Sequence, residues 1–306
     1  MKNLFSVLDT PIEKRDRFLE ANLKSFPYVN GSLFKQQPGE EIPPFTEEIA
    51  HLLITNASAD FDWSEISPTI FGAVFESTLN PETRRKGGMH YTSIENIHKV
   101  IDPLFMDDLN DEFTEINKLP LGDAKKKKLA SFQMKLASLK FFDPACGSGN
   151  FLTETYVSLR RLENKVIQSI TGGQVILGFD EVNPIKVSIH QFYGIEINDF
   201  AVTVATTALW IAESQMMRET EEIIRFEDNY LPLKSYSNIK EGNALHIAWT
   251  DVVNPQDLNY IIGNPPFVGA SMMNDEQKED AVKIFGKIKL SNSIDYVGAW
   301  YYKAAE

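Results

Sequence analysis

The sequence predicts a doubly wound α/β fold, in which parallel strands alternate with helices. Four short apolar runs, each ending in a turn, predict strands near residues 140, 193, 239 and 261. Two of these runs lead directly into apolar residues at helical spacing, which predicts the crossover helices of a parallel sheet. The first of these helices carries Phe151, Leu152, Thr155, Leu159, Leu162 and Val166, and the second runs from Phe200 to Ala212.

A glycine-rich turn lies between the first predicted strand, Leu139 to Phe142, and its helix. It reads Asp143-Pro144-Ala145-Cys146-Gly147-Ser148-Gly149. Glycine lets a ligand approach bare backbone, and a helix N-terminus attracts an anionic group. Because many such turns only pack a helix against a sheet, a lone G-x-G is a weak signal. Its position directly after Asp143-Pro144 strengthens the binding interpretation.

Polar residues follow the second and third predicted strands. Glu196 ends the run that begins at Phe192, and an acidic residue at this place in a doubly wound sheet usually bonds ribose hydroxyls. Asp199 is interpreted as the N-cap of the following helix. Asn243 follows the strand near Ile239 and can offer its amide to the edge of an adenine ring. An ordinary asparagine in a tight turn is the competing interpretation.

The fourth predicted strand ends in Asn264-Pro265-Pro266-Phe267. Methyl transfer from a sulfonium to an aromatic amine needs acceptors that hold the two amine hydrogens, so that the nitrogen lone pair faces the electrophile. The side-chain oxygen of Asn264 and the carbonyl of Pro265 are suited to this. Phe267 could stack on an extruded base, which is worth roughly 1 to 3 kcal/mol. Two prolines that merely end a strand are the alternative.

A helix with Ile94, Ile97, Ile101, Leu104 and Phe105 on one face follows His90-Tyr91-Thr92-Ser93. Thr92 and Glu95 have the spacing of a capping box, which predicts that Thr92 caps this helix. Free backbone amides at such a helix start could meet a cofactor carboxylate. A cap with a packed ring is the alternative interpretation of Thr92 and Tyr91.

Taken in this order, the motifs resemble those of the amino (N6-adenine) DNA methyltransferases that use S-adenosylmethionine. The resemblance is closest to the MmeI-like branch of single-chain restriction-modification enzymes. Three further stretches, residues 27–34, 62–68 and 70–76, also resemble the family. The resemblance therefore covers most of the chain, from about Pro27 to the end.

The resemblance implies a role for each motif. Tyr91 and Thr92 fall at the cofactor-contacting segment ahead of the first strand, and Glu196 and Asn243 at the ribose and the adenine. The family often has Asp at position 243, but an amide both donates and accepts, so binding need not be lost. The implied methionine-binding residues are Asp143, Ala145, Gly147 and Gly149, and the implied catalytic residues are Asn264, Pro265, Pro266 and Phe267.

The family usually folds a seven-stranded class I methyltransferase sheet of the Rossmann-like type, whereas only four strands are predicted here. The chain is therefore interpreted as a fragment: a helical connector over 1–80 and an S-adenosylmethionine-binding methyltransferase domain over 81–306, without the last strands and the target-recognition domain. Its fourth strand would then lie at a sheet edge. We expect marginal stability, self-association through that edge, or coverage by a helix over 293–306 that carries Val297, Trp300 and Tyr301.

The composition fits this interpretation. A net charge of −13 over 306 residues indicates that double-stranded DNA is bound mainly by regions missing from this sequence, because Lys and Arg supply most of the nonspecific affinity for DNA. The single cysteine, Cys146, is interpreted as a packing residue and suits a reducing, cytoplasmic compartment. Neither a membrane span nor a metal site is expected. The run Lys125 to Lys128 is interpreted as a solvated face just before the helix of Leu129, Phe132, Leu136 and Leu139.

Two other functions fit the same motifs. A protein glutamine N-methyltransferase can use an Asn-Pro-Pro-aromatic turn to hold a side-chain amide. A non-catalytic cofactor-binding fragment is the other alternative, because strands of the usual sheet are missing. The helix around Tyr91 and the connector ahead of it favour DNA.

Overall fold

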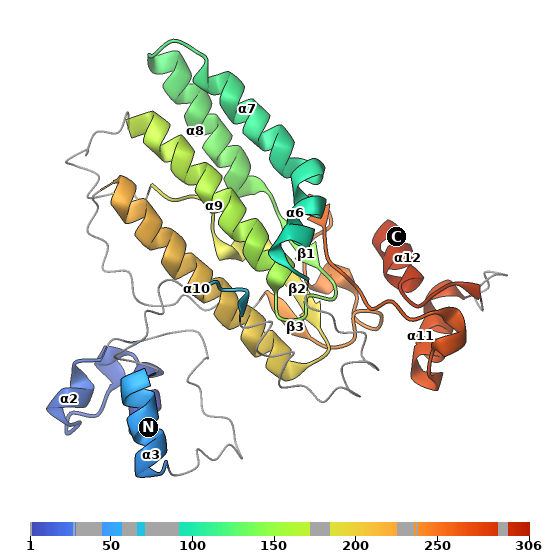
Figure 1. Cartoon of the computed structure of the whole chain (residues 1–306), viewed down its shortest axis with the longest axis horizontal. Coiled ribbons are helices and arrows are strands. Elements are labelled where there is room, and N and C mark those ends of the chain that lie inside the picture. Colours follow the sequence, from blue (N-terminus) through green and yellow to red (C-terminus); the bar gives the residue numbers. More distant parts are fainter. Residues whose placement is uncertain are drawn as a thin grey trace. The chain divides into compact units, whose positions relative to one another are not determined.

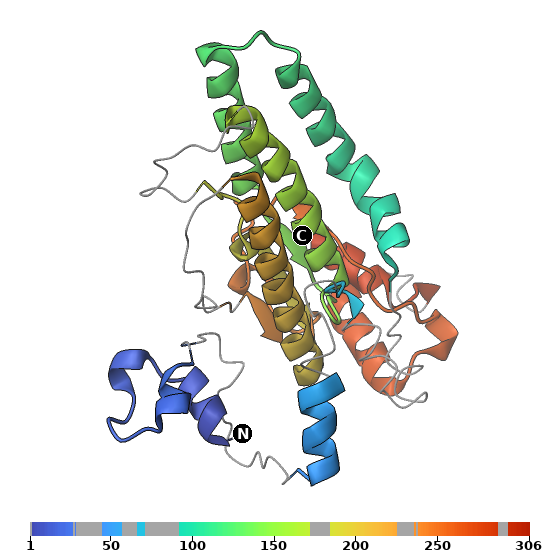
Figure 2. The ribbon, with the colours of Figure 1, turned by 60° about the vertical axis from the view of Figure 1, so that its left-hand side comes forward.

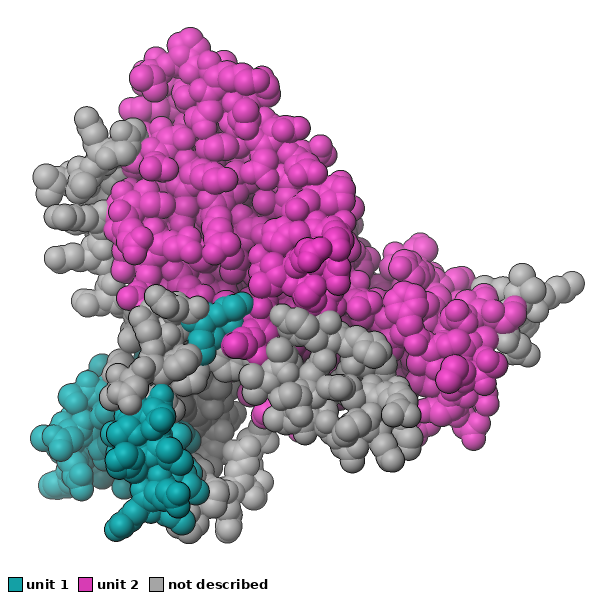
Figure 3. Space-filling view, in the orientation of Figure 1, with its two compact units in different colours: residues 1–67, 227–236 teal, residues 68–226, 237–306 magenta. Residues whose placement is uncertain are grey.

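The computed structural model describes residues 2–26, 28, 45–56, 66–70, 92–171, 184–224, 236, 238–286 and 293–306. The chain forms two compact units (Figure 3), one of residues 1–67 with 227–236 and the other of residues 68–226 with 237–306. The predicted boundary between 80 and 81 lies outside the described residues, so that division stays a prediction.

The first unit is helical where it is described. Its elements are α1 (Lys2–Leu8), η1 (Ile12–Lys14), α2 (Ala21–Lys24) and α3 (Glu47–Ile54). The guanidinium of Arg15 ties the turns between them, since it donates to the carbonyl of Thr10 at 2.9 Å and to that of Phe26 at 2.7 Å. No helix in the described part of the chain is long and apolar enough to cross a bilayer.

The second unit contains a parallel sheet. Its strands are β1 (Phe141–Asp143), β2 (Phe192–Glu196), β3 (Ile239–Glu241) and β4 (Tyr260–Ile261), in the order β3-β2-β1-β4. All three strand pairs are parallel. The four predicted strands are therefore confirmed, and so is the doubly wound α/β fold class.

Long helices cover one face of this sheet. Figures 1 and 2 show α7 to α10 as a row in which neighbouring helices contact one another. Two elements precede the row, α6 (Ile94–Ile101) and a π-helical turn η4 (Asp102–Met106). The row itself consists of α7 (Asp107–Asn117), α8 (Asp123–Ser138), α9 (Asn150–Thr171) and α10 (Asp199–Ile223). Shorter elements are η5 (Ile189–Gln191), η6 (Trp249–Asp251), η7 (Ala270–Met272), α11 (Asp275–Phe285) and α12 (Gly298–Ala305).

Alternation along the strands separates two hydrophobic layers. Phe141 lies in register with Phe192 and Tyr260, and its ring stacks on theirs at centroid distances of 5.2 and 5.4 Å. This ladder faces the long helices, where Phe105 packs against it. The next residue, Phe142, points to the opposite face and joins a core that includes α11 and α12. Both faces of the sheet are thus covered, as a parallel sheet requires.

Three local predictions are wrong. Ser93, not Thr92, caps α6, because its side chain accepts from the backbone N–H of Asn96. Asn198, not Asp199, caps α10, since its side chain accepts from Ala201 N–H at 2.9 Å. In both cases the cap is the last extended residue before the helix, which spacing alone locates only within a residue or so. The run Lys125 to Lys128 is mostly exposed, as predicted, but it lies inside α8 rather than before it, since lysine is a good helix former.

The terminal helix does not cover the outer edge of β4. The indole N–H of Trp300 donates to the carbonyl of Pro144 at 3.2 Å, and the Lys303 ammonium bonds the carbonyls of Ala244 and Ile247. α12 therefore packs over the segments that follow β1 and β3. Trp300 and Val297 are buried, whereas Tyr301 is exposed. Self-association through β4, an edge strand among the described residues, stays a prediction.

Candidate active site

The segments predicted to carry the chemistry meet at one edge of the sheet. Because all four strands are parallel, their carboxyl ends lie together, and this is where ligands bind in open α/β sheets. The glycine turn follows β1, Glu196 ends β2, Asn243 follows β3 and Asn264 follows β4. Tyr91 lies outside the described residues.

The glycine turn is built by short backbone bonds. The carboxylate of Asp143 accepts from Ala145 N–H at 2.9 Å, and Gly149 N–H donates to the Cys146 carbonyl at 2.8 Å. Gly149 has a φ of 78°, and a Cβ there would lie 2.9 Å from the Cβ of Ala205 in α10. At Gly147, with a φ of 55°, a Cβ would meet nothing within 4 Å. Gly149 thus serves helix packing, whereas Gly147 exposes backbone to open space.

Glu196 joins two of these segments. Its carboxylate is buried, and its two oxygens accept from Gly147 N–H and from Asn198 N–H, each at 2.9 Å. Burial raises the pKa of Glu196, although the backbone donors oppose that shift. Glu196 therefore orients the glycine turn directly, a role that spacing did not predict.

Asp143 is a second buried acid beside Glu196. Its side chain is 1% exposed, and burial, with a smaller contribution from the charge of Glu196, raises its pKa to about 7. Burial and these two acids also raise the pKa of the Cys146 thiol well above its ordinary value. Cys146 therefore stays a protonated thiol, and it packs against Gly194 in β2. This environment disfavours the thiolate, which is the nucleophilic form of cysteine.

Asp143 should make the protein less stable as the pH rises. In the unfolded chain this carboxyl ionises near 3.8, but in the folded protein it holds its proton to about 7. Between these values the unfolded state binds fewer protons, so rising pH favours unfolding. At 1.36 kcal/mol per pKa unit the effect reaches about 4 kcal/mol. We expect Asp143→Asn to remove it; urea unfolding from about pH 4 to pH 8 measures the difference, and parallel curves for both proteins would contradict it.

The segment after β3 is held from α11. The amide nitrogen of Asn243 donates to the carboxylate of Asp280 at 2.9 Å, while the Asn243 oxygen accepts from Leu245 N–H at 2.9 Å. The competing interpretation of a turn asparagine is thus partly correct, since the bond to Leu245 closes an Asx-turn. Sequence reasoning missed Asp280 altogether, because it lies in a helix rich in exposed acids and only tertiary contacts distinguish it.

The Asn-Pro-Pro-Phe turn lies against the glycine turn. A Cβ on Gly263 would lie 2.3 Å from the Asp143 carboxylate, so only glycine fits directly before Asn264. The amide nitrogen of Asn264 donates to the Thr92 hydroxyl at 3.3 Å. Phe267 is 68% exposed. The structure therefore brings Thr92, Asp143 and Asn264 together, and Gly263 is a further residue of this group whose only sequence signal is its place before Asn264.

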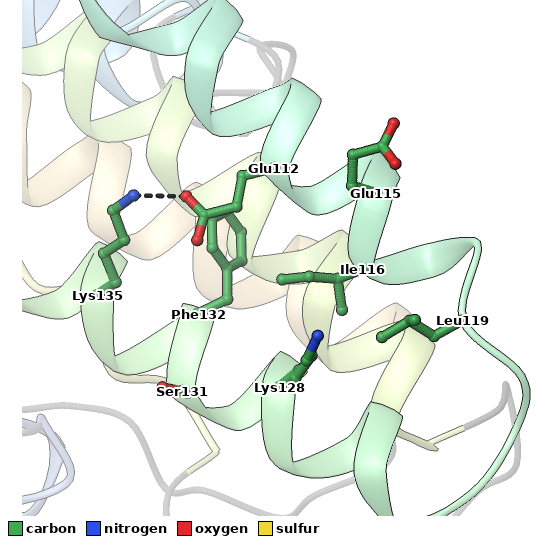
Figure 4. A pocket seen from close by; sticks show the side chains of 8 residues that line it. All are labelled: Glu112, Glu115, Ile116, Leu119, Lys128, Ser131, Phe132 and Lys135. Carbon is green, nitrogen blue, oxygen red and sulfur yellow. Dashed lines mark hydrogen bonds and ion pairs between the residues drawn. The ribbon is translucent and has the colours of Figure 1, made fainter.

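The groove between α7 and α8 is separate from this site (Figure 4). It has a volume of about 550 Å³, and an ion pair between Lys135 and Glu112 crosses it at 2.5 Å. Its lining mixes Ile116, Leu119 and Phe132 with charged side chains. No group of three or more potential metal ligands occurs in the part of the chain that the structure describes.

The comparisons with known proteins point to one family. The model of the family described as MmeI, DNA-methyltransferase domain, matches residues 121–306. DNA methyltransferase A of Bacillus subtilis is 40% identical over all of this chain, which spans 34% of that protein. A putative type II restriction enzyme and methyltransferase of Methanocaldococcus jannaschii is 26% identical over 82% of the chain and 24% of the relative.

A solved structure agrees with the sequence relatives. The type IIL restriction-modification enzyme MmeI, determined in complex with DNA, superposes with a TM-score of 0.87 and 42% identity over 99% of this chain. The chain spans 39% of that protein, so it corresponds to about a third of the length of its relatives. Because the family model covers more than half of the sequence, this chain belongs to the MmeI DNA-methyltransferase domain family.

Proposed function

We propose that the chain is the catalytic core of an S-adenosylmethionine-dependent DNA methyltransferase that acts on the exocyclic N6 of adenine, within a restriction-modification or phage-defence enzyme. One observation carries the proposal: the glycine turn and the Asn-Pro-Pro-Phe turn pack against each other, with the Asp143 carboxylate seated on Gly263. A cofactor on the first turn is thereby next to a target on the second.

The residues at this edge fit the cofactor. Gly147 leaves its side of the turn open, which suits the methionine part. The carboxyl of Asp143, with a pKa of about 7, can ionise beside a cationic ammonium. Glu196 still has lone pairs for ribose hydroxyls after its two backbone bonds. Ile197 and Phe200 expose large apolar side chains just past β2, which suit an adenine face.

S-adenosylmethionine supplies an electrophilic methyl group on a sulfonium. The chain's part is to present the acceptor. Because the Asn264 amide nitrogen is engaged by Thr92, its oxygen is left to accept one hydrogen of the target amine, and the Pro265 carbonyl takes the other. These bonds turn the N6 lone pair towards the methyl group. The exposed ring of Phe267 stacks on the extruded base, and Pro266 fixes the turn between them.

The identity of the methylated nucleoside tests the proposed target. The longest natural polypeptide that contains this sequence is incubated with plasmid DNA and labelled cofactor, and the nucleosides are separated by mass spectrometry. We expect N6-methyladenine. Methylation of cytosine N4, or label on a protein glutamine with none on DNA, would replace the proposed target. Cofactor binding without any transfer would support a non-catalytic role.

Glu196→Ala should weaken binding of S-adenosylmethionine by roughly 1 to 3 kcal/mol, the usual contribution of hydrogen bonds to a charged group. Glu241 provides the matched control, since it ends β3 in register with Glu196 but is exposed. Glu241→Ala should leave binding unchanged. Calorimetry on the purified chain measures both, and urea unfolding shows whether each variant is folded. Equal affinities for Glu196→Ala and wild type would remove Glu196 from the site.

A further inference from the structure

The carboxylate of Asp280 links α11 to two other segments around the proposed adenine position, the one that follows β3 and the one that precedes α12. It accepts from the amide of Asn243 at 2.9 Å, from the Nε2 of His246 at 2.5 Å and from the hydroxyl of Tyr296 at 2.9 Å. Asp280 is only 6% exposed. Although burial opposes ionisation, these three donors hold the pKa of Asp280 below its ordinary value, and burial together with Asp280 raises that of Tyr296. Asp280 is therefore an ionised acceptor.

Both ends of the Asn243 amide are held by the protein. One N–H is given to Asp280, and the oxygen accepts from Leu245 N–H at 2.9 Å. An amide has two N–H groups and two oxygen lone pairs, so one donor and one acceptor remain. That pair is the pattern with which asparagine bonds the edge of an adenine, donating to a ring nitrogen and accepting from the exocyclic amine.

We propose that Asp280 is a positioning residue that fixes the orientation of the Asn243 amide and thereby makes the cofactor site selective for an adenine ring. Without this anchor only the bond from Leu245 N–H opposes rotation of the amide, a rotation that exchanges its donor and its acceptor. On the edge that contains N1, a flipped amide matches hypoxanthine, which carries a carbonyl and an N1–H in place of the amine and the N1 acceptor of adenine. The inference rests on the proposed cofactor site and adds a residue that does not touch the ligand.

The same geometry explains why residue 243 carries an amide. An aspartate at 243 would place a second carboxylate against that of Asp280, at the 2.9 Å that now separates a donor from an acceptor. Two adjacent carboxylates cannot both stay ionised without a large cost. Exchanging the two residues reverses the hydrogen bond and restores one donor and one acceptor. The contact between residues 243 and 280 is therefore expected to form with Asn and Asp, or with Asp and Asn, but not with Asp and Asp, although Asp at 243 has no N–H for the adenine ring.

The test measures dissociation constants of S-adenosylhomocysteine and of its S-inosyl analogue by calorimetry. Wild type should prefer the adenosyl compound. Asp280→Ala should reduce this preference about 10-fold, the size expected for one hydrogen bond to a charged group. The matched control is Asp275→Asn, which removes an exposed acid from the same helix and should change neither constant. Loss of affinity for both compounds by the same factor would indicate a merely structural role and overturn the proposal.

The exchanged pair is a second, independent arm. Asn243→Asp alone should weaken binding of S-adenosylhomocysteine at least about 10-fold. Adding Asp280→Asn should recover the part of that loss that comes from the two adjacent carboxylates, but not the part that comes from the missing N–H to the ring nitrogen. Urea unfolding shows whether each variant is folded. Failure of the double variant to recover affinity, when both proteins are folded, would contradict the coupling. If wild type binds neither compound, the proposed cofactor site itself fails, which is a different outcome from a wild type that binds and an Asp280 that has no effect.

Discussion

Gly263→Ala is expected to abolish cofactor binding and to destabilise the protein by about 3 kcal/mol or more. The added Cβ would lie 2.3 Å from the Asp143 carboxylate and 2.8 Å from its carbon, far inside contact distance. Asp143 is buried and bonded to Ala145 N–H, so it cannot move without breaking the glycine turn. The backbone of Gly263, at a φ of 155°, adds strain. Such a clash belongs to the overpacking class of severe mutations.

The clash has an internal control. If Asp143 is the obstacle, Asp143→Ala combined with Gly263→Ala should be more stable than the sum of the two single changes predicts, because the space is freed. Gly286→Ala is the matched glycine control. Its φ of 54° is also positive, but a Cβ there would meet nothing within 4 Å, so it should cost only about 1 to 2 kcal/mol. Additive effects of the two changes at 143 and 263 in a double-mutant cycle would contradict this account.

The sheet could be predicted from the sequence because each strand is a short apolar run that ends in a turn. Phe141 and Phe142 are both buried, one on each face, so the run is continuous and apolar, as is usual for parallel sheets. Once the strands were assigned as parallel, their carboxyl ends had to meet at one edge. The grouping of Asp143, Glu196 and Asn264 follows from that topology alone.

Contacts between distant segments could not be predicted in the same way. Asp280 lies 37 residues after Asn243, and no local spacing relates an acid in one helix to an amide beyond a strand. The bond between Thr92 and Asn264 spans 172 residues. Thr92 was expected to cap α6, but Ser93 takes that role and leaves the Thr92 hydroxyl to Asn264. Side-chain hydrogen bonds of this kind depend on tertiary placement, which periodicity does not encode.

Asn264→Ala is expected to reduce the methylation rate about 10² fold or more while leaving cofactor affinity nearly unchanged. The side-chain oxygen is assigned to the target amine, where it stabilises the charge that develops as the methyl group is transferred, and removing one positioned acceptor has an effect of this size. The side chain is exposed and contacts Thr92 rather than the glycine turn, so the fold should persist. Single-turnover methylation in the longest natural polypeptide with this sequence measures the rate, and calorimetry the affinity.

The control separates the acceptor oxygen from the orienting bond. Asn264→Asp keeps an acceptor but loses the N–H that donates to Thr92, and it adds a negative charge near a buried pair of acids. Thr92→Val removes only the partner of that N–H. The rate should therefore fall most for Asn264→Ala and least for Thr92→Val, which retains the whole amide. A Thr92→Val rate as low as that of Asn264→Ala would show that the hydroxyl acts on the reaction itself, and a wild-type rate for Asn264→Ala would remove Asn264 from the catalytic turn.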